Sequence, residues 1–563
     1  MRIAGDIEAA LEQLHSGRWQ RLTQEELKTK VSQRFVMGWR VNMPLGSLQF
    51  LEVDSLILAV DNCFPYSQIR IFAPAAGSDY CWPHIEQNGL LCLRPTRCSA
   101  PTADRIAVHM SDAEELLNYS ETTRRAEFER EFATYWAHMA TDEPNRARVL
   151  SLVAPRGEAR EVFYFNDTKA GRFIIGDEKP ALVKWLRNSG VNPGNKDIFS
   201  TWLFRLSRPW TPKEFPLRGA EIAKILPPEV APRCLIPGLR VPFLFEADTE
   251  TGTAFVAVVL RGPERRAVVK GFRHISRVPI ERIVNFYTNQ AVDRCKVSRV
   301  DGAWVHGRDH SLTFSAANGR SVAIIGCGAI GASLARILAQ AGVGEIMLVD
   351  GDSLTTANVS RHLLGIGHVG FNKASLLQCE LSKQFPHLTF DHAFQRRFEH
   401  LTKEERGILA CADLIIACGI DFDGEATLDT WRRSLPQPPA YLSTWVEAYA
   451  VAGHAVLLYG DRSILSGFDE EERPKFRLTD WPEDVGVLIA EAGCGNSFQP
   501  HGVVDLHPTI GLAAGLAIDA TLDKVPVSCR RVWMGDPSAV ELNGGKHRSN
   551  FTEAMTIREF PWQ

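Results

Sequence analysis

The first 150 residues change from a helical to a strand-like pattern of apolar positions. Apolar residues between Ile3 and Leu14 recur every three to four positions and Gly17 follows them, which predicts an amphipathic helix. Short apolar runs separated by Pro, Gly and Asn then predict strands. These runs lie at 34–43, 48–53, 55–60 and 68–73. Helical periodicity returns near 111–119 and over 124–139. Residues 1–150 are therefore predicted to form an α+β domain.

Residues 151–305 carry strand-like runs but no motif that points to chemistry. The runs lie at 161–166, 172–177, 254–260 and 267–272. A helical pattern covers 181–190, and a proline-rich loop extends from Arg208 to Pro242. We expect an α+β domain that connects its two neighbours.

The remaining region, 306–563, has the pattern of a parallel sheet with crossover helices. A buried-strand run at 322–325 is followed by a glycine turn, a helical pattern over 332–342 and a second strand run at 345–350. This is a βαβ unit, and apolar runs at 413–418 and 454–459 predict further strands. The whole chain is thus predicted to be an α/β multidomain protein that ends in a Rossmann-like domain.

Composition narrows the class of protein. The chain has 563 residues, which allows three or four domains at about 150 residues each. A net charge of −4 argues against nucleic-acid binding by bulk charge. No apolar run reaches the roughly 18 residues of a membrane span. Acidic residues such as Asp6 and Glu8 stand where a signal peptide needs an apolar stretch. We expect a cytoplasmic protein that binds neither nucleic acid nor a membrane.

Cysteine usage excludes two further classes. The twelve cysteines are too few for a disulfide scaffold. The sequence contains no CxxC pair, so the usual signature of a structural zinc site is absent. In a reducing compartment most of these thiols are expected to be buried and inert, and Cys81 and Cys98 are interpreted as structural. Two other cysteines stand in a context that suggests reactivity, and they are treated below.

Three glycines form a nucleotide-binding turn. Gly326, Gly328 and Gly331 give GxGxxG between a predicted strand and a predicted helix. The glycines permit a tight turn and let phosphate approach the helix N-terminus. Asp350 ends the next strand 24 residues after Gly326, where a carboxylate can accept hydrogen bonds from a ribose.

The residues that follow are not those of a dehydrogenase. Five polar or charged side chains lie within 24 positions: Asp350, Asp352, Asn358, Arg361 and Lys373. Closely spaced cations suit an enzyme that cleaves ATP between the α- and β-phosphates, because the departing pyrophosphate needs its charge paired. Asp421 follows the strand at 413–418, where a carboxylate can hold Mg²⁺ against phosphates, and Asp423 is a second candidate for that role.

At these residues the chain resembles the adenylation domain of ubiquitin-activating enzymes and of their bacterial ThiF/MoeB-type relatives. The resemblance covers about residues 305–563 and implies that Asp350 and Asp352 lie at the nucleotide, with Asp350 on its ribose. It also implies that Asn358, Arg361 and Lys373 handle phosphates and that Asp421 binds Mg²⁺. The family uses ATP to activate the C-terminal glycine carboxylate of a small protein. It usually works as a homodimer in which an arginine enters the partner's site, and Arg308 has the matching position.

Cys494 is the first cysteine with a reactive context. It lies in EAGCGNSFQPHG, where Gly493 and Gly495 leave the sulfur approachable. Activating enzymes carry their catalytic cysteine after the nucleotide-site elements, as here. We therefore expect Cys494 to take the acyl group from the adenylate as a thioester; His501 and His507 have no predicted role.

Cys92 is the second cysteine whose sequence context suggests reactivity. An FP pair follows a strand run, another strand run comes next, and an aromatic-proline turn at Trp82–Pro83 precedes GLLCL. This order and the spacing from Pro83 to Cys92 resemble the core of ubiquitin-conjugating enzymes over residues 1–150. The resemblance implies that Cys92 carries a thioester and passes the acyl group to an amine. The family's usual asparagine is replaced by His84, which can donate an N–H to the oxyanion in its place.

Both halves in one chain resemble bacterial fusions of conjugating and activating enzymes, as found in CBASS antiphage operons. The resemblance implies a ligase for the C-terminal tail of a ubiquitin-like protein or of a CBASS nucleotidyltransferase, with lysines of a target as acceptors. We predict domains at 1–150, 151–305 and 306–563. Three alternatives are weighed: a sulfur-carrier activator of the MoeB/ThiF type with Cys92 idle, an NAD-dependent oxidoreductase, and a non-catalytic scaffold.

Overall fold

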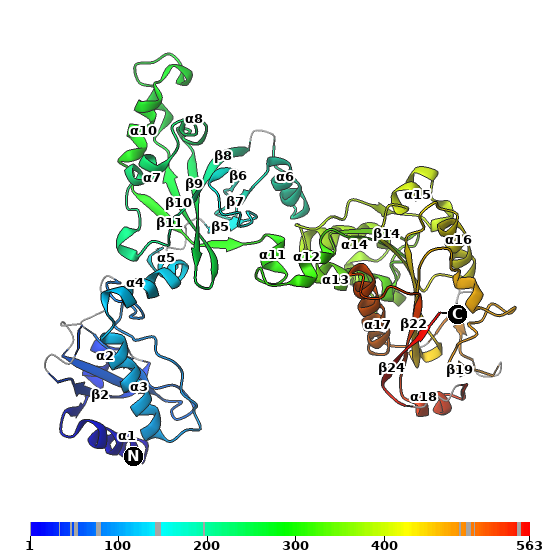
Figure 1. Cartoon of the computed structure of the whole chain (residues 1–563), viewed down its shortest axis with the longest axis horizontal. Coiled ribbons are helices and arrows are strands. Elements are labelled where there is room, and N and C mark those ends of the chain that lie inside the picture. Colours follow the sequence, from blue (N-terminus) through cyan, green and yellow to red (C-terminus); the bar gives the residue numbers. More distant parts are fainter. Residues whose placement is uncertain are drawn as a thin grey trace. The chain divides into compact units, whose positions relative to one another are not determined.

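The computed structural model divides the chain into two compact units. One comprises residues 1–150, 155–175 and 198–298, and the other 151–154, 176–197 and 299–563. The structure describes residues 2–32, 34–44, 48–49, 54–74, 80–140, 148–194, 197–482, 486–490, 497–499, 501–548 and 553–562. Each unit combines sheets and helices, so the predicted α/β multidomain class is confirmed (Figure 1).

The N-terminal part of the first unit is an antiparallel four-stranded sheet, in the order β1-β2-β3-β4. Its strands are β1 (Trp19–Arg21), β2 (Phe35–Asn42), β3 (Ser55–Asp61) and β4 (Arg70–Phe72). Side chains alternate along β3, so Leu56 and Leu58 join a core with α1 (Arg2–His15) and α3 (Thr102–Leu117). Ile57 points to the other face, where it packs with Leu27 of α2 (Gln24–Lys30).

Two short helices stand where a single helix over 124–139 was predicted. They are α4 (Glu121–Arg130) and α5 (Phe132–Met139), and Glu131 between them leaves helical geometry with φ −101° and ψ 25°. The helix predicted near 111–119 begins earlier, as α3, and ends at Leu117. The break makes α5 a separate helix, which still contacts α4 where the rings of Phe128 and Tyr135 lie 4.8 Å apart.

The rest of the first unit is built on an eight-stranded sheet of order β11-β10-β9-β8-β6-β7-β5-β12. The strands are β5 (Arg148–Ser151), β6 (Arg160–Asp167), β7 (Arg172–Gly176), β8 (Ile198–Arg205), β9 (Arg240–Thr249), β10 (Gly252–Arg261), β11 (Val292–Cys295) and β12 (Val297–Arg299). The helices are α7 (Gly219–Ile225), α8 (Ala231–Cys234), α9 (Arg265–Val269) and α10 (Ile280–Thr288). We refer to this part of the first unit, residues 155–175 and 198–298, as the central domain.

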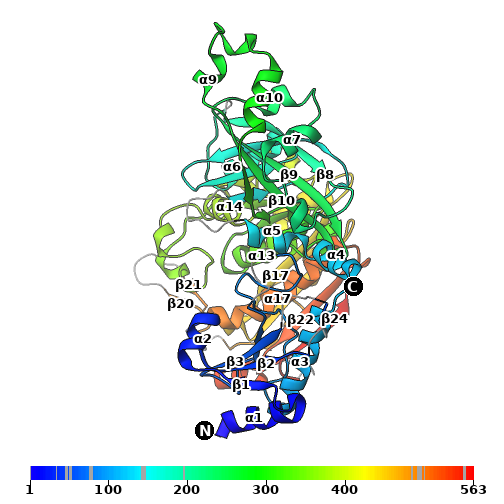
Figure 2. The same cartoon turned by 90° about the vertical axis from the view of Figure 1, so that its left-hand side faces the viewer.

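One strand prediction in this region is wrong. The run 267–272 lies partly in α9, which Figure 2 shows with α10 beyond the end of β10. Within the run Val268 is fully buried, whereas Lys270 and Gly271 are exposed. A strand would need apolar residues at alternate positions on a sheet face, and this short run supplies only one turn of helix.

The second unit contains an eight-stranded sheet of order β15-β14-β13-β16-β17-β18-β22-β24, parallel from β15 to β17 and antiparallel beyond. Its strands are β13 (Ser321–Ile325), β14 (Glu345–Val349), β15 (Ala393–Phe394), β16 (Leu414–Cys418), β17 (Ala440–Val446), β18 (Ala452–Leu458), β22 (Cys529–Met534) and β24 (Thr556–Pro561). Short strands β19 (Thr479–Asp480), β20 (Ile489–Ala490), β21 (Ser497–Phe498) and β23 (Lys546–His547) form two separate pairs, β19 with β23 and β20 with β21.

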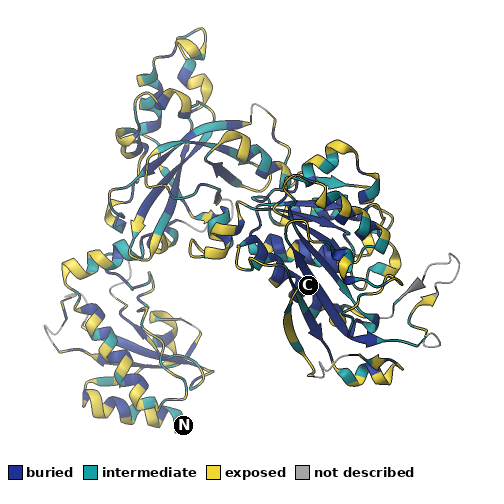
Figure 3. Cartoon of the chain, turned by 45° about the vertical axis from the view of Figure 1, so that its right-hand side comes forward, coloured by how far each residue is buried: buried dark blue, intermediate teal, exposed yellow. Residues whose placement is uncertain are grey.

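Helices cover both faces of this sheet, as the sequence pattern predicts for a Rossmann-like domain. On one face α13 (Ala329–Ala341), α14 (Lys373–Gln384) and α17 (Val503–Thr521) pack against the even positions of β13. On the other, α15 (Lys403–Leu409) and α16 (Phe422–Arg433) meet the odd positions. Figure 3 shows the strands buried between helices with exposed outer faces. The remaining helices are α6 (Lys179–Asn188), α11 (Gly302–Val305), α12 (Leu312–Ala317) and α18 (Pro537–Leu542).

Two features bear on the predicted domains and on membranes. Lys184 of α6 lies 2.9 Å from a carboxylate oxygen of Asp391, so this stretch of the predicted connecting domain packs with the second unit.

Of the described helices, α17 is long and apolar enough to cross a bilayer, but half of it is buried. Leu506, Ile510 and Leu516 belong to the sheet's core, which makes α17 a core helix here.

Candidate functional site

The turn after β13 has the shape that its glycines were predicted to allow. Gly326 has φ +92°, and a Cβ there would stand 2.7 Å from the carbonyl oxygen of Cys418. A Cβ at Gly331 would lie 1.9 Å from the Gly326 oxygen, so helix and strand touch where α13 begins. Gly328 is the N-cap of α13, and a Cβ added there meets nothing within 4 Å. The helix N-terminus is therefore open for an anionic group.

A cavity of about 360 Å³ lies in front of this turn. It stands at the carboxyl ends of β13, β14 and β16, where neighbouring parallel strands bring their following loops together. Six of the predicted residues line it: Gly326, Gly328, Asp350, Asp352, Lys373 and Asp421.

Asp350 and Lys373 form the inner side of the cavity. The Asp350 carboxylate accepts the backbone N–H groups of Cys327 and Asp352, each at 2.7 Å. Burial raises the pKa of Asp350, while these hydrogen bonds and the charge of Lys373 oppose the shift. Lys373 opens α14, is nearly buried, and places Nζ 3.1 Å from a carboxylate oxygen of Asp352.

Asp421 forms the opposite side. One carboxylate oxygen caps α16 by accepting the N–H of Gly424 at 2.8 Å. The other lies 2.6 Å from Nη2 of Arg397. The hydrogen bond from Gly424 and the Arg397 guanidinium lower the pKa of Asp421, so the carboxylate is ionised and half-exposed toward the cavity.

A larger groove of about 630 Å³ adjoins the cavity. The two share Gly328, Cys418, Gly419 and Ile420. Aromatic rings dominate the groove's walls: Phe422, Trp445, Phe468 and Trp481. Glu425 and Ser443 are buried residues that also line it, and burial raises the pKa of Glu425 to about 7.

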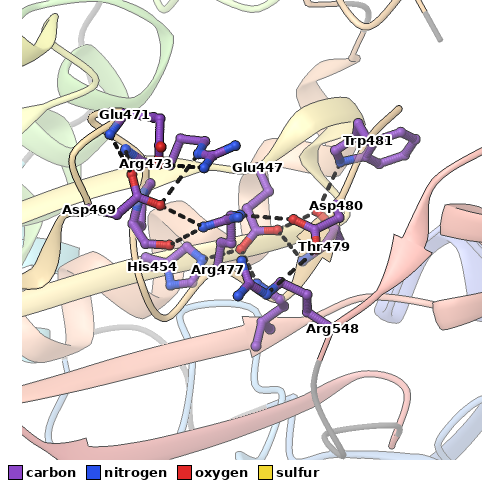
Figure 4. A network of polar contacts seen from close by, with 12 residues as sticks. Glu447, His454, Asp469, Glu471, Arg473, Arg477, Thr479, Asp480, Trp481 and Arg548 are labelled. Carbon is purple, nitrogen blue, oxygen red and sulfur yellow. Dashed lines mark hydrogen bonds and ion pairs between the residues drawn. The ribbon is translucent and has the colours of Figure 1, made fainter. Parts of the chain in front are cut away.

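A polar network holds one wall of the groove in place (Figure 4). Glu447 lies against His454 Nε2 at 2.7 Å and accepts the backbone N–H groups of Leu478 and Thr479 at 2.7 and 2.9 Å. Burial opposes ionisation of Glu447, but these hydrogen bonds outweigh it and lower its pKa. Beside it, Arg477 contacts Asp480 at 3.0 Å. The wall is thus cross-linked by hydrogen bonds, and the charge of Arg477 is neutralised.

Cys92 is presented by the loop that follows β4. Its thiol is exposed, its N–H donates to the carbonyl of His84 at 2.8 Å, and Sγ lies 3.9 Å from a carboxylate oxygen of Glu86. Desolvation by its surroundings, then the charges of Glu86 and Glu131, raise the pKa of this thiol.

His84 is held by the two helices that follow α3. Its backbone has φ +57°, a left-handed conformation that costs energy for a non-glycine residue. Its N–H donates to the hydroxyl of Tyr135 at 2.6 Å. Its ring places Nε2 2.9 Å from Glu127 and Nδ1 3.6 Å from Glu131. The ring therefore faces these carboxylates, and its predicted contact with an oxyanion stays a prediction.

Comparison with known protein families matches two separate stretches of the chain. The Prokaryotic E2 family B model matches residues 12–143, and the ThiF family model matches residues 315–438. The chain therefore carries a stretch similar to prokaryotic E2 proteins and, further along, a stretch similar to ThiF proteins. These matches confirm both resemblances that the sequence suggested.

Several curated proteins are similar to part of this chain. The ATP-dependent ubiquitin transferase-like protein Cap2 of Pseudomonas aeruginosa is 30% identical over 237 residues, or 41% of this chain and 40% of Cap2. Ubiquitin-like modifier-activating enzyme 5 of Dictyostelium discoideum is 26% identical over 221 residues, or 36% of this chain and 51% of that enzyme. The chain thus spans about half or less of these relatives. A crystal structure of E. coli MccB with ATP aligns at 18% identity over 46% of this chain and 67% of that one, with a TM-score of 0.30.

Three residues of the ThiF cavity were missed by the sequence analysis: Arg397, Phe398 and Glu399. They follow β15, which has only two residues, and so no periodic run marks their position. The available signal was the pair Arg396–Arg397 after a short apolar stretch. In the E2-like domain Glu86, Glu127 and Glu131 were missed for a different reason, since their relation to Cys92 and His84 is purely tertiary.

Other predicted residues lie outside the described cavity lining. Asn358 accepts from the N–H and hydroxyl of Thr355 at 3.1 and 3.0 Å, and Arg361 donates to the Ala357 carbonyl at 3.0 Å. Asp423, the alternative to Asp421, is exposed in the first turn of α16. Arg308 is exposed after α11 with φ +51°.

Cys494 lies outside the described residues, so its predicted thioester role stays a prediction. The described residues on its C-terminal side include Gln499 and His501, and both line the aromatic groove.

Proposed function

We propose that this protein is an ATP-dependent protein ligase that joins the C-terminal glycine of a partner protein to an amine of a target. The observation that carries the proposal is the cavity in which a glycine turn, a buried lysine and an ionised, half-exposed aspartate converge beside an aromatic groove. The similarity to Cap2 and to ubiquitin-like modifier-activating enzyme 5 supports activation and conjugation of a ubiquitin-like protein.

The first step is adenylation. The partner's terminal carboxylate attacks the α-phosphate of ATP, an acyl-adenylate forms, and pyrophosphate leaves. The open N-terminus of α13 and the Lys373 ammonium favour phosphate charge, and Arg397 can turn from Asp421 to the departing pyrophosphate. Asp350 accepts from the ribose at the end of β14, and Asn358 and Arg361 are proposed to close over the phosphates.

The donor set fits Mg²⁺ that arrives with ATP. Magnesium is commonly held by one or two carboxylates together with phosphate oxygens and water. Asp421 and Asp352 line the cavity with half-exposed or largely exposed side chains. Among the described residues no group of three or more His, Cys, Asp or Glu could hold a metal by itself. Mg²⁺ would supply charge for the phosphates, and Asp421 would hold it once Arg397 moves away.

Two thioesters follow. The Cys494 thiolate attacks the acyl-adenylate and releases AMP, and the Cys92 thiolate then takes the acyl group and frees Cys494. A target lysine finally attacks the Cys92 thioester, which forms an isopeptide bond and frees Cys92. Glu86, 3.9 Å from Sγ, can take up the proton that the attacking amine loses. His84 is proposed to donate to the oxyanion when its ring leaves Glu127.

The groove beside the ATP cavity is proposed to receive the partner's tail in extended form. A tail laid over Phe468 and Trp445 brings its terminal carboxylate to Gly328, where groove and cavity meet. We propose a ubiquitin-like protein or a CBASS nucleotidyltransferase as the partner, a homodimer in which Arg308 reaches the other protomer's site, and a cytoplasmic role in antiphage defence.

ATP–pyrophosphate exchange tests the first step. With the protein encoded beside this chain as the candidate partner, exchange should depend on that partner's terminal glycine and should fall at least about 100-fold in Asp421→Ala. Asp423→Ala is the matched control, since this neighbouring carboxylate is exposed outside the cavity lining. Equal exchange in Asp421→Ala and the wild type would refute the assignment, and hydride transfer to NAD would replace it with the oxidoreductase alternative.

A further inference from the structure

The E2-like domain and the central domain meet at α5, which touches both. Trp136 of α5 is fully buried and its ring packs on Phe215 at 4.8 Å and on Trp210 at 6.3 Å. Its indole N–H donates to the carbonyl of Cys295 in β11 at 3.1 Å. Trp210 in turn packs on Phe245 of β9 at 5.0 Å. Trp136 is therefore anchored in an aromatic socket of the central sheet.

The neighbouring residue on α5 reaches the loop that carries Cys92. Tyr135 is buried, and its hydroxyl accepts the N–H of His84 at 2.6 Å. The carbonyl of the same His84 accepts the N–H of Cys92 at 2.8 Å. Three hydrogen bonds thus lead from the central sheet through Trp136, Tyr135 and His84 to the cysteine.

The strained backbone of His84 shows why this contact matters. A non-glycine residue at φ +57° persists only where its surroundings hold it, and such strain costs about 1–3 kcal/mol. The holding groups are the Tyr135 hydroxyl and the carboxylates of Glu127 and Glu131, all from the α4–α5 segment. If α5 moves, the loop loses the contacts that fix its shape.

We propose that the central domain positions the Cys92 loop through α5, with Trp136 as the anchor and Tyr135 as the contact. The central domain is then part of the scaffold of the conjugating site and not only a connection between two enzymes. Trp136 and Tyr135 act through His84 and are positioning residues.

Alkylation of Cys92 in the full-length chain tests this without ATP or partner, so its result is independent of the proposed function. The charged groups that face the thiol are Glu86, Glu131 and Arg70, and the net effect of the surroundings is to raise its pKa. Loss of the anchor should move Glu131 away and open the loop to water. Both changes lower the pKa of Cys92 and increase its thiolate fraction at pH 7.

The measurement is the rate of alkylation by iodoacetamide between pH 6 and 10, with Cys92 resolved from Cys81 by peptide mass spectrometry. Trp136→Ala should shift the midpoint of the profile down and speed alkylation at pH 7 by about threefold or more, which corresponds to half a pKa unit. Tyr135→Phe removes only the hydroxyl that holds His84 and should shift the profile in the same direction by less.

Trp185→Ala is the matched control. Trp185 is an equally large, buried residue, but it lies in α6 of the second unit. Its truncation should leave the Cys92 profile unchanged, and a shift as large as that of Trp136→Ala would overturn the proposal. An unchanged profile in folded Trp136→Ala would do the same. Should Trp136→Ala fail to fold, Tyr135→Phe decides, because it keeps the packing of α5 and an unchanged profile there is also a refutation.

Discussion

Gly331→Ala should loosen the first turn of α13 although alanine is the better helix former. By intrinsic propensity the substitution would stabilise an exposed helix by up to about 1 kcal/mol. Here the new Cβ would stand 1.9 Å from the carbonyl oxygen of Gly326, whereas ordinary Cβ contacts begin at 3.4 Å. Because the clash is with backbone, no side chain can rotate away and α13 must move off β13.

The expected cost follows from this overpacking. Forcing an extra methyl into a closely packed site costs roughly 1–3 kcal/mol or more, which corresponds to a change of about 5–150-fold in a local opening equilibrium. Gly328→Ala is the matched control, since a Cβ there meets nothing within 4 Å and its φ of −76° suits alanine. It should leave the fold intact and weaken ATP binding, because the methyl group enters the space proposed for phosphate.

Hydrogen exchange is the suitable assay, because a multidomain chain has no single unfolding free energy. Amide exchange of peptides from β13 and α13 should be faster by that factor in Gly331→Ala and unchanged in Gly328→Ala. Wild-type exchange in Gly331→Ala would mean that β13 and α13 do not pack as closely as described, and the reasoning about the turn would be wrong.

Three further results are expected. Cys494→Ala should form acyl-adenylate but no thiol-sensitive adduct, whereas Cys92→Ala should load Cys494 and yield no thiol-resistant conjugate; wild-type conjugation by Cys92→Ala, followed by gel shift, would favour the simpler activator. Burial raises the pKa of Glu425 from 4.5 to about 7, so the folded chain binds a proton at Glu425 more tightly than the unfolded chain does. The stabilisation that this proton provides is complete below about pH 4.5 and is lost as the pH rises through about 7. Glu425→Gln should therefore flatten the loss of amide protection in α16 peptides between pH 5 and 8, measured by hydrogen exchange and corrected for the intrinsic exchange rate, and an unchanged slope would contradict this pKa. Arg308→Ala should lower pyrophosphate exchange while light scattering still reports a dimer; unchanged exchange would remove Arg308 from the site.

The ThiF cavity was largely predictable because its parts follow consecutive strands. Asp350 ends β14 and Asp421 follows β16, and the carboxyl ends of parallel strands meet at one edge of a sheet. Local patterns therefore carried three-dimensional information. Arg397 escaped because β15 has two residues, too few to show alternation, although the arginine lies within 2.6 Å of Asp421.

The site around Cys92 was predictable only in part. The sequence located Cys92 and His84, which are close along the chain and belong to one motif. Glu127 lies 43 residues after His84, on a helix whose break at Glu131 has no clear sequence signal. A helical pattern over 124–139 indicates which residues are apolar, but not that two short helices turn their carboxylates toward a loop.

The two sites use charge in opposite ways, and this fits the order of the proposed steps. In the ThiF cavity Lys373 and Arg397, paired with Asp352 and Asp421, are the cations that the proposed departure of pyrophosphate would use. At Cys92 desolvation, followed by the charges of Glu86 and Glu131, raises the pKa of the thiol, which weakens the free cysteine as a nucleophile at neutral pH. Such a thiol needs an acyl donor that is already activated, and a thioester on another cysteine is one. The same carboxylates attract a lysine ammonium and are proposed to take up the proton that it must lose before it attacks the loaded Cys92. The acidic surroundings of Cys92 therefore slow the attack of its free thiol, but favour transfer of the acyl group from the loaded Cys92 to an amine.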